Sequence, residues 1–116
     1  LLAVERDEEQ AARGRQVYTR ACAVCHLDTL RGDSVSPTLV GPSFFARFPD
    51  VTALEMVTAI RGSMPQNAPD SLGDQAYVDL VSYLLKVNGN GSGTSELKVD
   101  VAELEKIIIT DQPRSR

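Results

Sequence analysis

The sequence predicts an all-α protein, and three observations lead to that fold class. Apolar residues recur at intervals of three and four positions in three segments, which is typical of helices packed on one face. The stretches between these segments are irregular and rich in glycine and proline, without the alternation that indicates a sheet. With 116 residues, the chain is long enough for one hydrophobic core and too short for two.

The first helix is expected over about residues 5–21. Ala11, Gly14, Val17 and Tyr18 are spaced three and four apart, and most charged side chains fall between them. Acidic residues near its beginning and an arginine near its end suit the helix dipole. The helix runs directly into ACAVCHLD, which contains both cysteines and the only histidine of the chain.

The second helix is expected over about residues 51–61. Asp50 or Thr52 is a possible N-cap, and Gly62 is the expected stop. The preceding stretch, residues 27–49, contains two glycines and three prolines without a sustained period. We therefore expect an ordered loop there, and loops of this length are usually functional.

The third helix follows a second irregular stretch, residues 62–73, and is expected to stop at the pair Asn88 and Gly89. Its apolar face is strong because four apolar residues repeat with the period of a helix. These residues are Tyr77, Leu80, Val81 and Leu84.

The end of the chain reads differently from the rest. Residues 88–95, NGNGSGTS, have the composition of a flexible connection. The segment after them, DVAELEKIII, has an apolar stripe at Val101, Leu104, Ile107 and Ile108, although its β-branched end equally suits a short strand. We therefore expect a main domain over residues 1–89 and a C-terminal extension over 90–116, packed on the domain or used for docking.

Composition excludes several classes of function. The formal net charge is −4 and no basic run is present, so nucleic acid is not an expected partner. No apolar stretch approaches the roughly 20 residues that cross a bilayer. The opening LLAVERDEEQ lacks the features of a signal peptide, so we expect a mature or excised chain. With three Phe, three Tyr and no Trp, large side chains are scarce, which leaves core volume for another group.

The segment CAVCH has four possible interpretations. A thiol redox pair normally follows a strand, which is not expected here, and zinc would need ligands from elsewhere. Chance burial of three unrelated residues is the third. The fourth is covalent attachment of haem, for which C-x-x-C-H is a specific signal. In this interpretation Cys22 and Cys25 bind the two vinyl groups and His26 ligates the iron. We then expect a fold of three to four helices packed around one covalently bound haem c.

A low-spin haem iron needs a sixth ligand, for which the candidates are Met56, Met64, a lysine or solvent. Met56 lies inside the expected second helix, where an apolar side chain is more often core. Met64 lies between Gly62 and Pro65, in a loop that is able to present its side chain. A thioether ligand favours the ferrous iron and electron transfer over oxygen binding. We therefore expect Met64 as the sixth ligand.

From about residue 10 to 89, the sequence resembles a class I c-type cytochrome. The run from Gly14 through Tyr18 to Cys22 resembles the family's N-terminal helix, whose glycine allows the C-terminal helix to cross closely. The resemblance implies that Tyr83 and Leu84 are the crossing partners. It also implies an all-α domain with the haem between the helices and one haem edge at the surface.

Two loops extend the resemblance. The run LVGPSF resembles the loop whose proline carbonyl accepts a hydrogen bond from the axial histidine, a role that falls on Pro42. The pair Met64 and Pro65 resembles the family's ligand loop. Arg47 and Arg61 lie near these loops and are candidate partners of the haem propionates.

The resemblance implies a one-electron carrier rather than an enzyme. It also implies a periplasmic location and a redox protein partner, either a dehydrogenase donor or an oxidase or cytochrome acceptor. Residues 90–116 resemble, less specifically, extensions of cytochrome domains associated with quinoprotein dehydrogenases. The alternative is therefore an electron-relay domain or subunit of a larger quinoprotein dehydrogenase. A third alternative, a haem-based sensor or peroxidase, would require an open sixth position.

Overall fold

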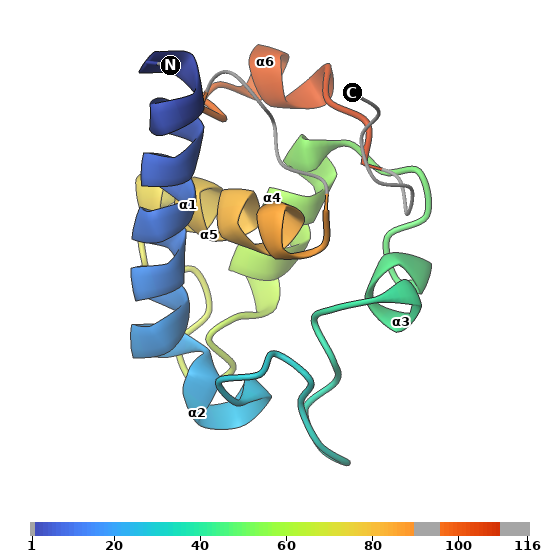
Figure 1. Ribbon diagram of the computed structural model, residues 1–116. Helices are drawn as coiled ribbons and strands as arrows, with labels where there is room; N and C mark the ends of the chain where they lie inside the picture. Colours follow the sequence, from blue (N-terminus) through green and yellow to red (C-terminus); the bar gives the residue numbers. More distant parts are fainter. Residues whose placement is uncertain (1, 90–95, 110–116) are drawn as a thin grey trace.

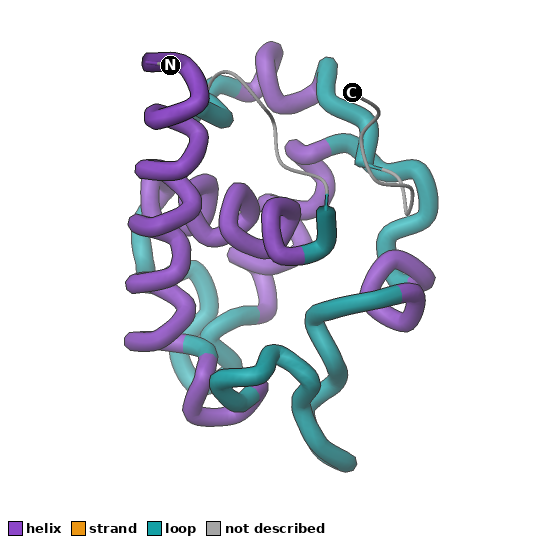
Figure 2. Tube along the Cα trace, viewed as in Figure 1, coloured by secondary structure: helices purple, strands orange, loops and turns teal. Residues whose placement is uncertain are grey.

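The computed structural model describes residues 2–89 and 96–109, with side chains from Glu8 onward, and these residues form an all-α fold (Figures 1 and 2). The fold class predicted from the sequence is confirmed. The three predicted helices are present, and three short ones accompany them in the described part of the chain. The helices are α1 (Leu2–Ala21), α2 (Ala23–His26), α3 (Pro42–Ala46), α4 (Ala53–Ser63), α5 (Asp74–Val87) and α6 (Val101–Glu105).

Helices α1 and α5 cross, as Figure 1 shows, and Gly14 lies at the crossing. A Cβ atom on Gly14 would be 2.0 Å from the carbonyl oxygen of Asp79 and 2.7 Å from the Cβ atom of Tyr83. Both distances are far below van der Waals contact, so only glycine permits this approach. Tyr83 is thus a crossing partner, as expected.

Helix α4 begins with a capping box. The Thr52 hydroxyl accepts a hydrogen bond from the Glu55 amide at 3.1 Å, and the Glu55 carboxylate accepts one from the Thr52 amide at 2.8 Å. Thr52 is therefore the N-cap. The expected stop at Gly62 is wrong, because the helix continues through Ser63 and Met64 is its C-cap. Pro65 ends the helix, since a residue before proline prefers an extended conformation.

Helix α3 was not expected from the sequence, which indicated only a loop over residues 27–49. Gly41 precedes it with a φ of 82°, and Pro42 occupies its first turn. Five residues are too few to show a helical period, although proline in the first turn is a common helix start. Helix α3 buries Phe44 and Phe45 in the core.

The C-terminal segment 96–109 packs on the rest of the protein. It buries Leu97, Leu104 and Ile109, and Ile108 forms an isolated antiparallel bridge with Thr52. The two interpretations of this segment are each right in part, because a short helix is followed by strand-like pairing. The predicted stripe fails at Val101 and Ile108, which are exposed. The expected flexible connection lies mostly at residues 90–95, outside the described residues.

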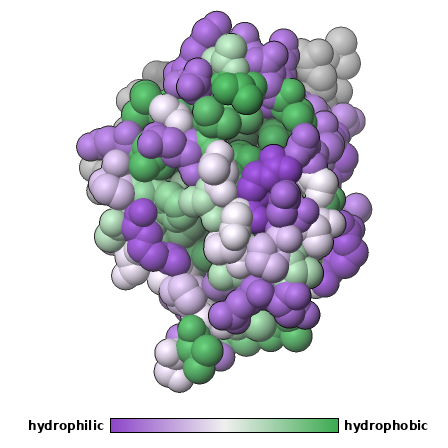
Figure 3. Space-filling view, turned by 180° about the vertical axis from the view of Figure 1, so that it is seen from behind, coloured by the Kyte–Doolittle hydropathy of each residue, from purple (hydrophilic) through white to green (hydrophobic). Residues whose placement is uncertain are grey.

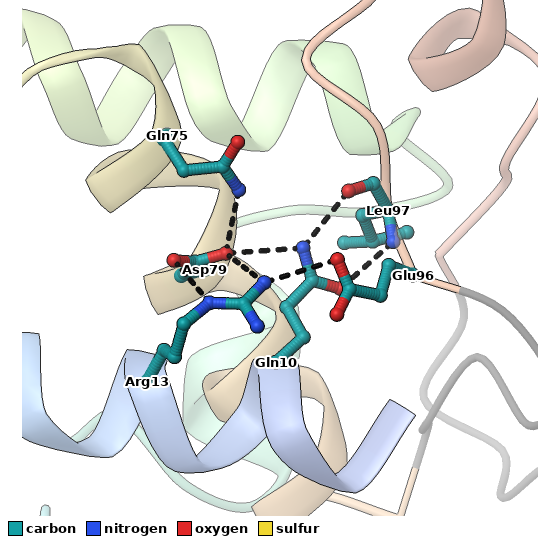
Figure 4. Close-up of polar contacts among 6 residues, drawn as sticks. All are labelled: Gln10, Arg13, Gln75, Asp79, Glu96 and Leu97. Carbon is teal, nitrogen blue, oxygen red and sulfur yellow. Dashed lines mark hydrogen bonds and ion pairs between the residues drawn. The ribbon is translucent and has the colours of Figure 1, made fainter. Parts of the chain in front are cut away.

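A buried polar cluster joins α1, α5 and the C-terminal segment (Figure 4). Gln10, which is fully buried, donates a hydrogen bond to the Leu97 carbonyl and accepts one from the Leu97 amide, both at 2.8 Å. The same side chain donates to Asp79 at 3.2 Å. Arg13 bridges Asp79 and Glu96 at 3.1 and 3.0 Å, so this cluster ties residues distant in sequence to one helix crossing.

Candidate functional site

The segment that follows α1 brings both cysteines and the histidine onto one short turn. The Cys22 amide donates to the Tyr18 carbonyl at 2.8 Å, which continues the helical pattern, and the His26 amide donates to the Cys22 carbonyl at 3.0 Å. Cys22 is half-buried, Cys25 is exposed, and neither forms a disulfide. His26 is buried. The three side chains line the same cavity.

The imidazole of His26 is oriented by a backbone carbonyl. Its Nδ1 lies 2.8 Å from the carbonyl oxygen of Pro37. Because a carbonyl only accepts, Nδ1 carries the proton and Nε2 is left with its lone pair available for a metal. Such a partner fixes the tautomer and the plane of a ligating histidine.

The expectation that the Pro42 carbonyl accepts this hydrogen bond is wrong, because Pro37 provides the acceptor. A tight turn explains the difference. Gly32, with a φ of 67°, donates from its amide to the His26 carbonyl at 3.0 Å, and the loop then returns past His26 at Pro37. Pro42 instead begins α3, and it is not among the residues that line the cavity.

The cavity has a volume of about 760 Å³. This lies within the range of about 300–1,000 Å³ that is usual for cofactor sites. Its walls come from α1, α2, the loop after α2, α3, α4 and α5, and they are mainly apolar. Examples are Leu39, Phe44, Phe48, Ile60, Leu80 and Leu84. Leu84, expected at the helix crossing, is one of these lining residues.

Met64 reaches this cavity from the end of α4, together with Pro65. Its backbone is extended, with φ −128° and ψ 146°, as expected for a residue before proline. Met56 is fully buried in the hydrophobic core and is not among the cavity-lining residues. The core role predicted for Met56 is therefore confirmed.

The donor groups at this cavity fit haem c. Two free thiols, an imidazole nitrogen and a thioether face one apolar space, and these are the groups that tether and ligate such a haem. Burial raises the pKa of Cys22 to about 11, so its thiol is neutral near pH 7. Redox-active C-x-x-C cysteines instead have lowered pKa values, which argues against the thiol redox interpretation.

The arrangement also argues against zinc. Within residues 2–89 and 96–109, the structure gathers no group of three or more His, Cys, Asp or Glu side chains suitable for one metal ion. A structural zinc site usually has four such ligands. The CAVCH residues therefore do not form a zinc site among the described residues.

The two candidate arginines differ in position. Arg47 lines the cavity, donates to the Thr38 carbonyl and places its guanidinium 5.7 Å from the centre of the Phe44 ring. Partial burial lowers the pKa of Arg47. Arg61 is not among the lining residues and is paired with two carboxylates. The structure therefore brings Arg47, and not Arg61, to the site.

The exposed part of the cavity lining combines apolar side chains with uncharged polar ones, Ser63, Gln66 and Asn67. Val24 and Val35, which are 85% and 86% exposed, belong to its lining. Arg47 is the one Lys, Arg, Asp or Glu side chain among the described lining residues. Figure 3 shows the molecule from behind, and on this face hydrophobic side chains gather across the upper part and are bordered by hydrophilic ones. Large exposed aliphatic residues beside a cavity are typical of a contact surface.

Sequence reasoning missed three residues that organise the site. These are Pro37, which orients His26, Tyr18, whose hydroxyl donates to the Leu27 carbonyl, and Tyr77, whose hydroxyl donates to the Met64 carbonyl. The sequence predicts helix positions for both tyrosines, and places Tyr18 in the run that resembles the family's N-terminal helix, but it assigns neither hydroxyl a partner. Their hydroxyl groups could have indicated a further role, because a buried phenol needs a hydrogen-bond partner.

Comparison with known proteins gives two matches. Residues 9–84 match the family described as "Cytochrome C oxidase, cbb3-type, subunit III". The protein "Alcohol dehydrogenase (quinone), cytochrome c subunit" of Gluconobacter oxydans (strain 621H) is 30% identical over 119 aligned residues, which cover 91% of this chain and 24% of that relative. The chain thus spans about a quarter of the relative's length. No solved structure gives a significant match.

Proposed function

Because this chain belongs to the c-type cytochrome family, whose haem domains transfer electrons, we propose that it is a monohaem one-electron carrier with His26 and Met64 as axial ligands. One observation carries the proposal. Cys22, Cys25, His26 and Met64, which come from two separate segments, line the same apolar cavity. Haem c bound there supplies an iron that cycles between the ferric and ferrous states.

Different residues have different roles in binding this haem. Cys22 and Cys25 tether one haem through thioether bonds. The hydrogen bond to Pro37 holds the His26 ring with Nε2 free. Met64 supplies a soft, neutral sixth ligand, which favours the ferrous iron and excludes substrates. Arg47 lies at the cavity wall and is the proposed partner of a propionate.

We propose that electrons enter or leave at the cavity opening beside Val24 and Val35. The partner is a redox protein that offers a matching apolar patch. Among the described residues no helix is long and apolar enough to cross a membrane. We place the chain in the bacterial periplasm, in keeping with haem attachment through C-x-x-C-H.

A second candidate is an electron-relay domain within a quinoprotein dehydrogenase. The similarity to a subunit named "Alcohol dehydrogenase (quinone), cytochrome c subunit" favours it. In both versions residues 1–89 are the cytochrome domain and 90–116 an extension, of which 96–109 packs on the domain. Co-purification with a quinoprotein dehydrogenase, followed by haem reduction on adding alcohol, would favour the relay over the free carrier.

Spectroscopy of variants tests the ligation. Met64→Ala should abolish the far-red sulfur-to-iron band of the ferric protein, lower the potential and admit carbon monoxide to the ferrous iron. Met56→Leu is the control and should keep the band, because Met56 lies in the core. A band that survives Met64→Ala would refute the assignment. Carbon monoxide binding to the unmodified protein would instead favour a sensor or peroxidase.

The mass of the denatured protein tests the attachment. We expect polypeptide plus one haem, retained through acid extraction. Loss of the haem on extraction, or a mass that fits a different number of haems, would contradict covalent monohaem binding through Cys22 and Cys25.

A further inference from the structure

Tyr77 holds the backbone of Met64 from the side of α5. The Tyr77 side chain is fully buried, and its hydroxyl donates to the Met64 carbonyl oxygen at 2.7 Å. The Met64 amide donates in turn to the Ile60 carbonyl at 2.8 Å. Both polar backbone groups of Met64 are therefore bonded, one to α4 and the other to α5.

Arg61 supports this contact from outside. Its guanidinium lies 5.5 Å from the centre of the Tyr77 ring, in the range of a cation–π interaction. The same group pairs with Asp70 at 3.0 Å and with Asp74. Asp70 belongs to the segment between Met64 and α5, whereas Asp74 is the first residue of α5. Arg61 thus links Asp70, within this connection, and Asp74, where α5 begins, to the ring of Tyr77.

From these contacts we propose that Tyr77, backed by Arg61, is a positioning residue that keeps the Met64 thioether at the sixth coordination position. The proposal rests on ligation by Met64, as given above. Met64 leaves the iron when its backbone moves away from the cavity. The hydrogen bond from the Tyr77 hydroxyl to the Met64 carbonyl opposes this movement, because the movement would leave the buried hydroxyl without a partner.

The proposal predicts easier displacement of Met64 in Tyr77→Phe. The ring and its packing remain, while the hydrogen bond is lost. One hydrogen bond of this kind corresponds to about a tenfold change in an equilibrium. Imidazole, titrated into the ferric protein, should therefore bind about tenfold more tightly, with loss of the sulfur-to-iron band at lower imidazole concentration.

Tyr83→Phe is the matched control. It removes a phenol hydroxyl from the same helix, and in the described part of the chain that hydroxyl makes no hydrogen bond. Its imidazole affinity should stay within about twofold of the unmodified protein. Arg61→Gln is the second variant, because it changes a partly exposed side chain and leaves the core intact. It should bind imidazole more tightly than the unmodified protein, by less than Tyr77→Phe does.

Three results would overturn the proposal. The first is an unchanged imidazole affinity in folded Tyr77→Phe, and the second is an equal gain in Tyr83→Phe. If Tyr77→Phe does not fold, unchanged affinity in Arg61→Gln overturns it instead. Failure of Met64 ligation itself is distinguishable, because the unmodified ferric protein would then lack the sulfur-to-iron band before any imidazole is added.

Discussion

Removing the side chain of Gln10 should destabilise the protein far more than an ordinary helix substitution. Gln10→Ala leaves the amide and the carbonyl of Leu97 without their partners in a fully buried place. Each buried backbone group left unsatisfied costs about 1–3 kcal/mol. Asp79 loses one hydrogen bond and keeps those from Arg13 and Gln75, so its carboxylate adds little to the loss. We therefore expect the free energy of unfolding to fall by about 3 kcal/mol.

The assay is guanidinium unfolding of the haem-loaded protein, followed by circular dichroism at a helical wavelength. Gln16→Ala is the control, because Gln16 lies exposed on the same helix and alanine is at least as good a helix former as glutamine. The control should stay within about 0.5 kcal/mol of the unmodified protein. Limited proteolysis adds a local readout, since Gln10→Ala should expose the segment 96–109 to cleavage first. A loss below about 1 kcal/mol, or unchanged cleavage, would refute the reasoning.

Two further predictions concern the haem and the docking surface. Arg47→Gln should lower the midpoint potential of the haem by on the order of tens of millivolts, because removing a nearby positive charge favours the ferric state. Arg47→Lys keeps the charge and should lower the potential less. If voltammetry shows the same potential for Arg47→Gln and the unmodified protein, Arg47 is not a propionate partner. Electron transfer with the native partner should change by less than about tenfold between low and physiological salt, because Val24 and Val35 at the cavity opening are apolar. A steeper salt dependence in stopped flow would show that a charged surface does the docking.

The helices and the cavity-lining motif were predictable because their signals are local. Apolar spacing located α1, α4 and α5, and C-x-x-C-H located the turn that follows α1. Met64 was separable from Met56 because a residue before proline is extended, whereas Met56 has helical neighbours on both sides. These inferences need only a few adjacent residues.

The missed features depend on contacts between distant residues. Pro37 and Pro42 both lie in the stretch for which the sequence predicts only a loop, and in the folded chain the turn at Gly32 is followed by the Pro37 carbonyl at His26. Gln10 reads as one more polar helix residue until Leu97, 87 positions later, is placed beside it. Local sequence patterns do not indicate these contacts, because the Pro37 carbonyl and the Leu97 backbone reach their partners only when the chain is folded.

The structure also indicates how one helix crossing fixes the two proposed ligands relative to each other. Tyr18 on α1 donates to the carbonyl of Leu27, the neighbour of His26, and Tyr77 on α5 donates to the carbonyl of Met64. Each proposed ligand is therefore anchored through a phenol to a different helix of the crossing pair. At Gly14 the two helices approach so closely that a Cβ atom there would lie 2.0 Å from the carbonyl oxygen of Asp79. The polar cluster around Asp79 locks the same crossing, so the geometry of the site depends on residues that do not touch it.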